Sequence, residues 1–285
     1  VGSIKKLEDR NKTVLVRFDL NIPLDELSSK INDRLTRIKG TINQLQALNS
    51  KIVILSHLGR PKGAVNQDLS LKQIINQLEE VLNSKVNFIN DCIGEEVKKK
   101  IDSFDQSSII LLENCRFHKG EEENNIEFAK KLSELADVYV NDAFGCVHRS
   151  HASVDAITKY MPSYVGNLLD EELQNLRNIT DKPESPSMTI LGGSKISTKI
   201  SVIKNLSIKM DSIVICGGMA NNFLAYNGHD VKNSLIEKDV DNLVQEIIFY
   251  AEKNKCNLIT PIDVVTASEI RENTEVYISP IDQIK

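Results

Sequence analysis

Short runs of valine and isoleucine alternate with longer amphipathic segments along this chain, and this alternation constrains the fold more than any other feature. Uninterrupted apolar runs bounded by turn residues are typical of parallel strands that are buried on both faces. The amphipathic segments have the periodicity of helices that cover such a sheet. Because strand and helix alternate, the sequence predicts an α/β fold built on doubly wound parallel sheets of the Rossmann-like kind.

The alternation occurs in two series, which predicts two α/β domains. The first series has expected strands at 13–18, 51–55, 86–89, 108–112 and 137–141, and helices at 34–49, 70–83, 95–102 and 125–136. The second has expected strands at 187–191, 212–216, 257–260 and 275–278, and helices at 195–208, 219–226 and 238–254. A charged helix at 168–179 and a polar stretch with proline and serine join them. We therefore expect an N-terminal domain over 1–160, a linker helix and hinge over 161–182, and part of a second domain over 183–285.

Composition excludes several classes of protein. The 285 residues are 41% hydrophobic and 26% charged, as in globular proteins, and the net charge of −5 argues against a general binder of nucleic acid or anionic membranes. The sequence contains no apolar run of the roughly 18 residues that a membrane-spanning helix requires. Its five cysteines form no C-x-x-C pair, which indicates reduced thiols and a cytoplasmic protein.

Unusual polar residues follow directly after four strands of the first series. They are Asp19, Asn21, His57, Arg60, Arg116, His118, Asn141, Asp142, His148, Arg149 and His151. Because the carboxyl ends of parallel strands lie at one edge of an open sheet, where ligands bind, we expect these side chains to converge. Taken singly, each also has a structural interpretation: a surface arginine, a turn-capping Asp19, or half of a metal site from His148 and His151.

If they converge, these residues form a cluster of positively charged and imidazole donors. Its members would be His57, Arg60, Arg116 and Arg149, with Arg37 from the helix before the second strand. Guanidinium groups match the oxygens of phosphate and carboxylate in pairs. The sequence therefore predicts a site for a small phosphorylated acid, with Asp19 and Asn21 facing its hydroxyl groups.

The second series carries a different device in the segment LGGSKISTK. Two glycines follow the expected strand, and Lys195 and Lys199 lie four residues apart on the expected first turns of the helix at 195–208. Glycines let backbone N–H groups approach phosphate oxygens, and this spacing would place both ammonium groups on one helical face. Gly217 and Gly218 after the next strand could admit a base or ribose. The alternative is a Gly-Gly turn with two solvated lysines.

Seven segments together resemble the phosphoglycerate kinase family. In chain order they are VRFDLNIP, SHLGRPKG, LLENCRFHKGEE, VNDAFGCVHRSHAS, LGGSKISTK, GGMANNFL and PIDVV. The resemblance covers essentially the whole sequence. It implies reversible phosphoryl transfer between 1,3-bisphosphoglycerate and ADP, giving 3-phosphoglycerate and ATP in glycolysis, with Mg²⁺ carried by the nucleotide. It also implies a cytoplasmic monomer that binds neither nucleic acid nor membranes.

The resemblance further implies roles for individual residues. Those implied to bind 3-phosphoglycerate are Asp19, Asn21, Arg37, His57, Leu58, Gly59, Arg60, Arg116 and Arg149. Those implied to bind the nucleotide are Gly193, Ser194, Lys195, Lys199, Gly217 and Gly218. Catalysis would fall to Arg37, Lys195 and Lys199, and the family's magnesium ligand would lie beyond Lys285, so no metal ligand is expected among these residues. Since only positioning and charge are needed, we expect direct in-line transfer after domain closure.

The sequence departs from the family at its end. It stops at SPIDQIK, before two further family segments, W-N-G-P-x-G-x-F-E and G-G-G-D-[ST], that would hold the magnesium nucleotide. We therefore expect an incomplete second domain and weak or no kinase activity from these 285 residues alone. Two other hypotheses stay open: a non-catalytic remnant that only binds a phosphorylated acid, and another sugar-phosphate enzyme with a doubly wound fold.

Overall fold

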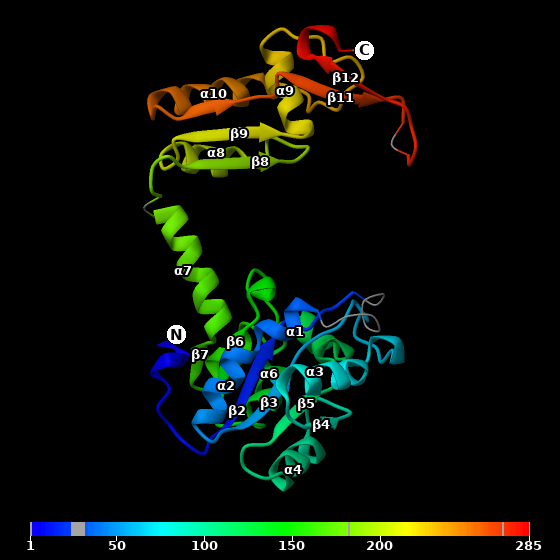
Figure 1. Cartoon of the computed structure of the whole chain (residues 1–285), viewed down its shortest axis with the longest axis vertical. Helices are drawn as coiled ribbons and strands as arrows, with labels where there is room; N and C mark the ends of the chain where they lie inside the picture. Colours follow the sequence, from blue (N-terminus) through cyan, green and yellow to red (C-terminus); the bar gives the residue numbers. More distant parts are fainter. Residues whose placement is uncertain (1, 24–31, 182, 270, 285) are drawn as a thin grey trace. The chain divides into compact units, whose positions relative to one another are not determined.

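The computed structural model describes residues 2–23, 32–181, 183–269 and 271–284, and the chain divides into two compact units, Val1–Gln174 and Asn175–Lys285 (Figure 1). Strands and helices alternate in both units, so the predicted α/β fold is confirmed. Within the described ranges, no helix combines the length and the apolar character needed to cross a bilayer.

The first unit is built on a seven-stranded sheet in the order β1-β7-β6-β2-β3-β5-β4, in which every pair is parallel. Its strands are β1 (Gly2–Ser3), β2 (Thr13–Phe18), β3 (Lys51–Leu55), β4 (Val86–Ile89), β5 (Ile109–Leu112), β6 (Val138–Asp142) and β7 (Ser163–Val165). The five strands expected in this series lie within one residue of those observed. The short strands β1 and β7 were not expected, because two or three residues cannot show an apolar pattern.

Helices cover both faces of this sheet. Helices α1 (Asp33–Arg37), α2 (Lys39–Ala47) and α3 (Ile75–Leu82) contribute to one apolar cluster, which also contains Val14 and Val16 of β2. Helices α4 (Glu95–Ser103) and α6 (Ile126–Ser133) contribute to another, which contains Leu15. Successive residues of β2 thus enter opposite layers, as a doubly wound sheet requires. Each fully buried aliphatic side chain stabilises the fold by about 1.5–3 kcal/mol.

The second unit has a three-stranded parallel sheet and a separate antiparallel pair. The parallel strands are β8 (Met188–Gly192), β9 (Ser212–Cys216) and β10 (Asn257–Ile259), in the order β10-β9-β8. Helices α8 (Ile200–Ser207), α9 (Gly218–Tyr226) and α10 (Asp241–Lys253) share an apolar cluster with them. The pair consists of β11 (Asp263–Ala267) and β12 (Val276–Pro280). Helix α7 (Asn167–Asp181) begins in the first unit and ends in the second.

Two expectations for the second unit were wrong. The strand expected at 275–278 is β12, which pairs antiparallel with β11 instead of joining the parallel sheet. The helix expected at 195–208 begins only at Ile200. The residues before it form turns, in which Thr198 Oγ1 donates to the carbonyl of Lys195 at 3.0 Å. Serine and threonine compete in this way for backbone hydrogen bonds and delay a helix start.

Candidate functional site

The strands β6, β2, β3 and β5 are neighbours in the sheet, so their carboxyl ends form one continuous edge. The predicted residues that follow these strands therefore lie along that edge. We call this set the polar rim, and it consists of Asp19, Asn21, His57, Leu58, Gly59, Arg60, Arg116 and Arg149. Ligands bind at such an edge in open α/β sheets.

His57 lies at the centre of the polar rim as a neutral donor. It is 4% exposed, and Arg17 Nη2 lies 2.9 Å from its Nδ1 atom. Because a guanidinium can only donate, Nδ1 accepts this hydrogen bond and the imidazole proton is left on Nε2. Burial lowers the pKa of His57 far below its ordinary value, and the charges of Arg17, Arg116 and Arg149 lower it further. Those three guanidinium groups are therefore close enough to act on one imidazole.

Arg116 is buried but incompletely paired. Its side chain is 2% exposed, and Nη1 donates to the carbonyl of Gly59 at 2.9 Å. The Nε atom lies 3.5 Å from Glu122 Oε1, and within the described part of the chain neither Nε nor Nη2 has a hydrogen-bond partner. Burial lowers the pKa of Arg116, with Arg149 adding to the effect. Buried donors are almost always satisfied, and Nη2 has neither a hydrogen bond nor an ion pair among the described residues, so this guanidinium has room for an anion.

The remaining cations of the prediction are more accessible. Arg60 is exposed, and Arg149 is half-buried with its Nε 3.2 Å from His148 Nε2. Arg37, at the end of α1, pairs with Glu172 through Nη2 at 2.9 Å and is half exposed. Its charge acts on the carboxyl of Asp142 at the end of β6. These side chains can therefore change partners when an anionic ligand arrives.

The backbone of Gly59 connects Asn21, which follows β2, to Arg116, which follows β5. Its N–H donates to Asn21 Oδ1 at 2.7 Å, while its carbonyl accepts from Arg116. Its φ of +61° and the 2.6 Å separation between an added Cβ and Leu69 Cδ2 permit only glycine without strain. The carboxylate of Asp19 pairs with Arg34 at 2.6 Å and accepts from the backbone N–H of Asn21 at 3.2 Å.

Sequence reasoning missed the buried residues beneath the polar rim. Arg17 and Glu121 are each 0% exposed and are joined through Ser153, which accepts from Arg17 Nε at 3.1 Å and donates to Glu121 at 2.6 Å. Arg17 lies within the expected apolar strand at 13–18. A buried arginine requires a partner, so an arginine inside such a run was a signal that could have been used. Asn114 was also missed; its amide donates to the carbonyl of Leu58 at 2.7 Å.

In the second unit the two glycine pairs lie against each other. The N–H of Met219 donates to the carbonyl of Gly193 at 2.7 Å. A Cβ added to Gly217 would lie 3.3 Å from that carbonyl oxygen, and one added to Gly218 would lie 3.5 Å from the Cα of Ser194. The contact at Gly217 is tight, and its φ of +66° disfavours a side chain, whereas the distance at Gly218 is an ordinary van der Waals contact.

Lys195 and Lys199 do not share a helical face, contrary to the prediction. Lys199 precedes the first residue of α8, and Lys195 lies in the loop before it. Both side chains are exposed. Both ammonium groups therefore belong to a loop. Helical hydrogen bonds do not fix the conformation of this loop, so it depends on the loop's contacts with the rest of the unit.

Two groups of three potential metal ligands occur among the described residues, and both lie in the first unit. They are Asp19, His57 and Cys146, and Asp91, Cys92 and His118. Neither group contains both His148 and His151, the pair that the sequence offers as half of a metal site.

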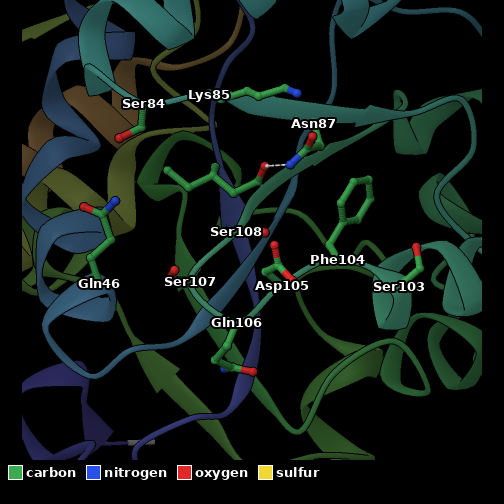
Figure 2. Close-up of a pocket in the computed structure, with 11 residues that line it drawn as sticks. Gln46, Ser84, Lys85, Asn87, Ser103, Phe104, Asp105, Gln106, Ser107 and Ser108 are labelled. Carbon is green, nitrogen blue, oxygen red and sulfur yellow. Dashed lines mark hydrogen bonds between the residues drawn. The ribbon is translucent and has the colours of Figure 1, made fainter.

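A separate cavity of about 530 Å³ lies by the amino ends of β4 and β5, lined by Lys85, Asn87 and Ser108 among others (Figure 2). It is at the opposite edge of the sheet from the polar rim.

Comparisons with known proteins agree on one family. The family model described as phosphoglycerate kinase matches residues 4–285. A phosphoglycerate kinase of Wolbachia sp. subsp. Drosophila simulans is 43% identical over 276 residues, which cover 97% of this chain and 69% of that protein. One of Bartonella bacilliformis is 42% identical over 282 residues, with 99% and 70% covered. The solved phosphoglycerate kinase of Coxiella burnetii has a TM-score of 0.84 at 35% identity and covers 99% of this chain and 71% of its own.

Proposed function

Because this chain belongs to the phosphoglycerate kinase family, we propose that its polar rim binds 3-phosphoglycerate and that its glycine pairs bind the nucleotide. The enzyme catalyses reversible phosphoryl transfer between 1,3-bisphosphoglycerate and ADP in glycolysis. Family membership favours this function over a non-catalytic remnant and over a different sugar-phosphate enzyme.

One observation supports the substrate site most strongly. Arg116 is a buried cation whose Nη2 has no partner among the described residues, and its charge acts on Arg149 and on the neutral imidazole of His57. Glu122 compensates part of the charge on Arg116, and an anionic ligand would compensate the rest. A ligand with a phosphate at one end and a carboxylate at the other supplies that charge.

Each type of side chain in the polar rim binds a different group of the substrate. Arg60, Arg116 and Arg149 pair with anionic oxygens, and neutral His57 donates its Nε2 proton without adding charge. Asp19 and Asn21 bind hydroxyl groups, while Leu58 and Gly59 shape the wall behind them. Arg37 releases Glu172 and turns to the transferring group.

In the second unit, backbone N–H groups at Gly193, Ser194, Gly217 and Gly218 approach the nucleotide. Lys195 and Lys199 neutralise the phosphates, and with Arg37 they stabilise the charge on the transferring phosphoryl group. Transfer is direct and in-line, because these residues supply position and charge and no nucleophile of their own.

Enzymes of this family use ATP and ADP with Mg²⁺. The two groups of candidate ligands contain histidine and cysteine, whereas Mg²⁺ prefers oxygen ligands and keeps several waters. Neither group therefore suits Mg²⁺, and we propose that it arrives on the nucleotide phosphates. We also propose that the enzyme is a cytoplasmic monomer. Its five cysteines are all unpaired, which fits a reducing compartment.

Calorimetric titration with 3-phosphoglycerate tests the substrate site. Arg116→Met keeps much of the buried volume and removes the charge, so we expect the dissociation constant to rise about 10- to 100-fold. The matched control is Arg10→Met, a charge change at an exposed position of the same unit. If both variants bind as tightly as the wild type, the proposed site is wrong. Thermal unfolding of both variants verifies that each is folded.

A further inference from the structure

Glu237 lies in the segment between α9 and α10, outside both proposed binding sites. Its carboxylate holds Ser197, a residue 40 positions earlier in the chain. Oε2 accepts from the Ser197 N–H at 3.1 Å, and Oε1 accepts from the Ser197 hydroxyl. Both oxygens are thus engaged by one residue, which lies between Lys195 and Lys199.

Glu237 is itself anchored to α9. Its backbone N–H donates at 2.9 Å to Oδ1 of Asn222, a side chain that is 4% exposed. The neighbouring Asn221 donates through Nδ2 to the carbonyl of Leu235 at 3.0 Å. The segment that carries Glu237 is therefore held by the helix that begins at Gly218, and it reaches from there to the lysine loop.

The lysine loop, residues 193–199, has few other attachments. Its first residue accepts from Met219 at 2.7 Å, and the side chain of Ile196 is 0% exposed in the core of the unit. The hydrogen bond from Thr198 to Lys195 is internal to the loop. In the second half of the loop, Ser197 is held by the side chain of Glu237, which lies outside the loop.

The charge of Glu237 also acts on this loop. Hydrogen bonds from the Ser197 side chain and backbone lower the pKa of Glu237, and the ammonium of Lys195 lowers it further. The carboxylate is therefore ionised near neutral pH and lies close enough to Lys195 for the two charges to interact. A fixed carboxylate beside that ammonium limits the positions that the lysine side chain can adopt.

We propose that Glu237 is a positioning residue for nucleotide binding, which holds the lysine loop in the conformation that presents Lys195 and Lys199 to the phosphates. The proposal rests on the function proposed above. Pre-formed loops bind more tightly because the ordering entropy has already been lost before the ligand arrives. A Glu237 that served only to stabilise the start of α8 would affect unfolding and leave nucleotide affinity unchanged.

The test uses the whole protein and measures dissociation constants for ADP and for 3-phosphoglycerate. We expect Glu237→Ala to weaken ADP binding about tenfold and to leave 3-phosphoglycerate binding unchanged. Ser197→Ala should weaken ADP binding in the same direction, and the double variant should lose no more than Glu237→Ala alone. Glu237→Gln keeps one acceptor oxygen and should recover part of the affinity.

The matched control is Glu246→Gln. Glu246 forms an ion pair with Lys204 in the same unit, away from the lysine loop. Wild-type ADP affinity in Glu237→Ala, or fully additive losses in the double variant, would overturn the proposal while leaving the proposed function intact. If the wild type itself bound no ADP, the proposed nucleotide site would fail together with it.

Discussion

Arg17 Nη2 donates to Nδ1 of His57 at 2.9 Å, so a buried cation holds a buried imidazole in its neutral form. The contact fixes which nitrogen of His57 carries the proton. It also joins the polar rim to the buried pair of Arg17 and Glu121 below the sheet edge. His57, in the polar rim, thus depends on residues that lie beneath it.

Stability should fall as pH decreases below the ordinary pKa of histidine. The pKa of His57 is lowered in the folded protein, whereas in the unfolded chain it is about 6.5. Below that pH the unfolded chain binds a proton that the folded protein refuses, so the free energy of unfolding decreases by up to about 1.4 kcal/mol per pH unit. His57→Asn keeps an acceptor for Arg17 and removes the titration.

Urea unfolding between about pH 5 and pH 7 measures this slope. The slope should be smaller in His57→Asn than in the wild type. It should not vanish, since burial also lowers the pKa of His151. Equal slopes in the two proteins would show that His57 is not held neutral by the fold.

Glu121→Gln should be strongly destabilising. Glu121 is 0% exposed and accepts from both the N–H and the hydroxyl of Ser153. The same hydroxyl accepts from Arg17 Nε, so Ser153 links the two charged side chains. Removing its charge leaves Arg17 buried without a compensating anion, which costs about 3–5 kcal/mol. Chemical denaturation measures the change, and Glu127→Gln, at an exposed carboxylate on α6, is the control. A loss below about 1 kcal/mol would mean that the buried charges are not coupled.

Much of the fold could be predicted, because strands buried on both faces must be continuous apolar runs. Residues 51–55 carry that pattern and form β3 with every side chain buried. The contacts of Gly59 with Asn21 and Arg116 followed from topology, since parallel strands share one edge. Arg17 was hidden inside such a run. The contact of Glu237 with Ser197 could not be predicted, because only the tertiary structure brings these residues together. The start of α8 could not be predicted either, because it depends on local competition by hydroxyl groups for backbone hydrogen bonds.

Gly59→Ala should weaken both stability and binding of 3-phosphoglycerate. The φ of +61° and the 2.6 Å approach to Leu69 Cδ2 force the backbone to shift, and that backbone positions Asn21 and Arg116. We expect a loss of about 1–3 kcal/mol in the free energy of unfolding. Gly94→Ala is the control, because its φ is +101° but nothing lies within 4 Å of the added Cβ. Binding should weaken in Gly59→Ala alone; equal affinity in both variants would contradict the link to the site.

The first turn of α7 should depend on Asp142. This carboxylate is 1% exposed and accepts from Thr41 Oγ1 at 2.6 Å and from the N–H of Leu169 at 2.9 Å. Thr41 in turn accepts from the N–H of Asn167 at 3.0 Å, so both residues satisfy amides that a helix start leaves unpaired.

Asp142→Asn and Thr41→Val should each cost about 1–3 kcal/mol, because each leaves buried donors without partners. Their effects should not add, since the two residues form one network. Hydrogen exchange of the amides of Asn167 and Leu169 gives a local measurement. In both variants these two amides should exchange faster by more than the change in global stability accounts for. Additive energies together with unchanged exchange would mean that α7 begins independently of β6.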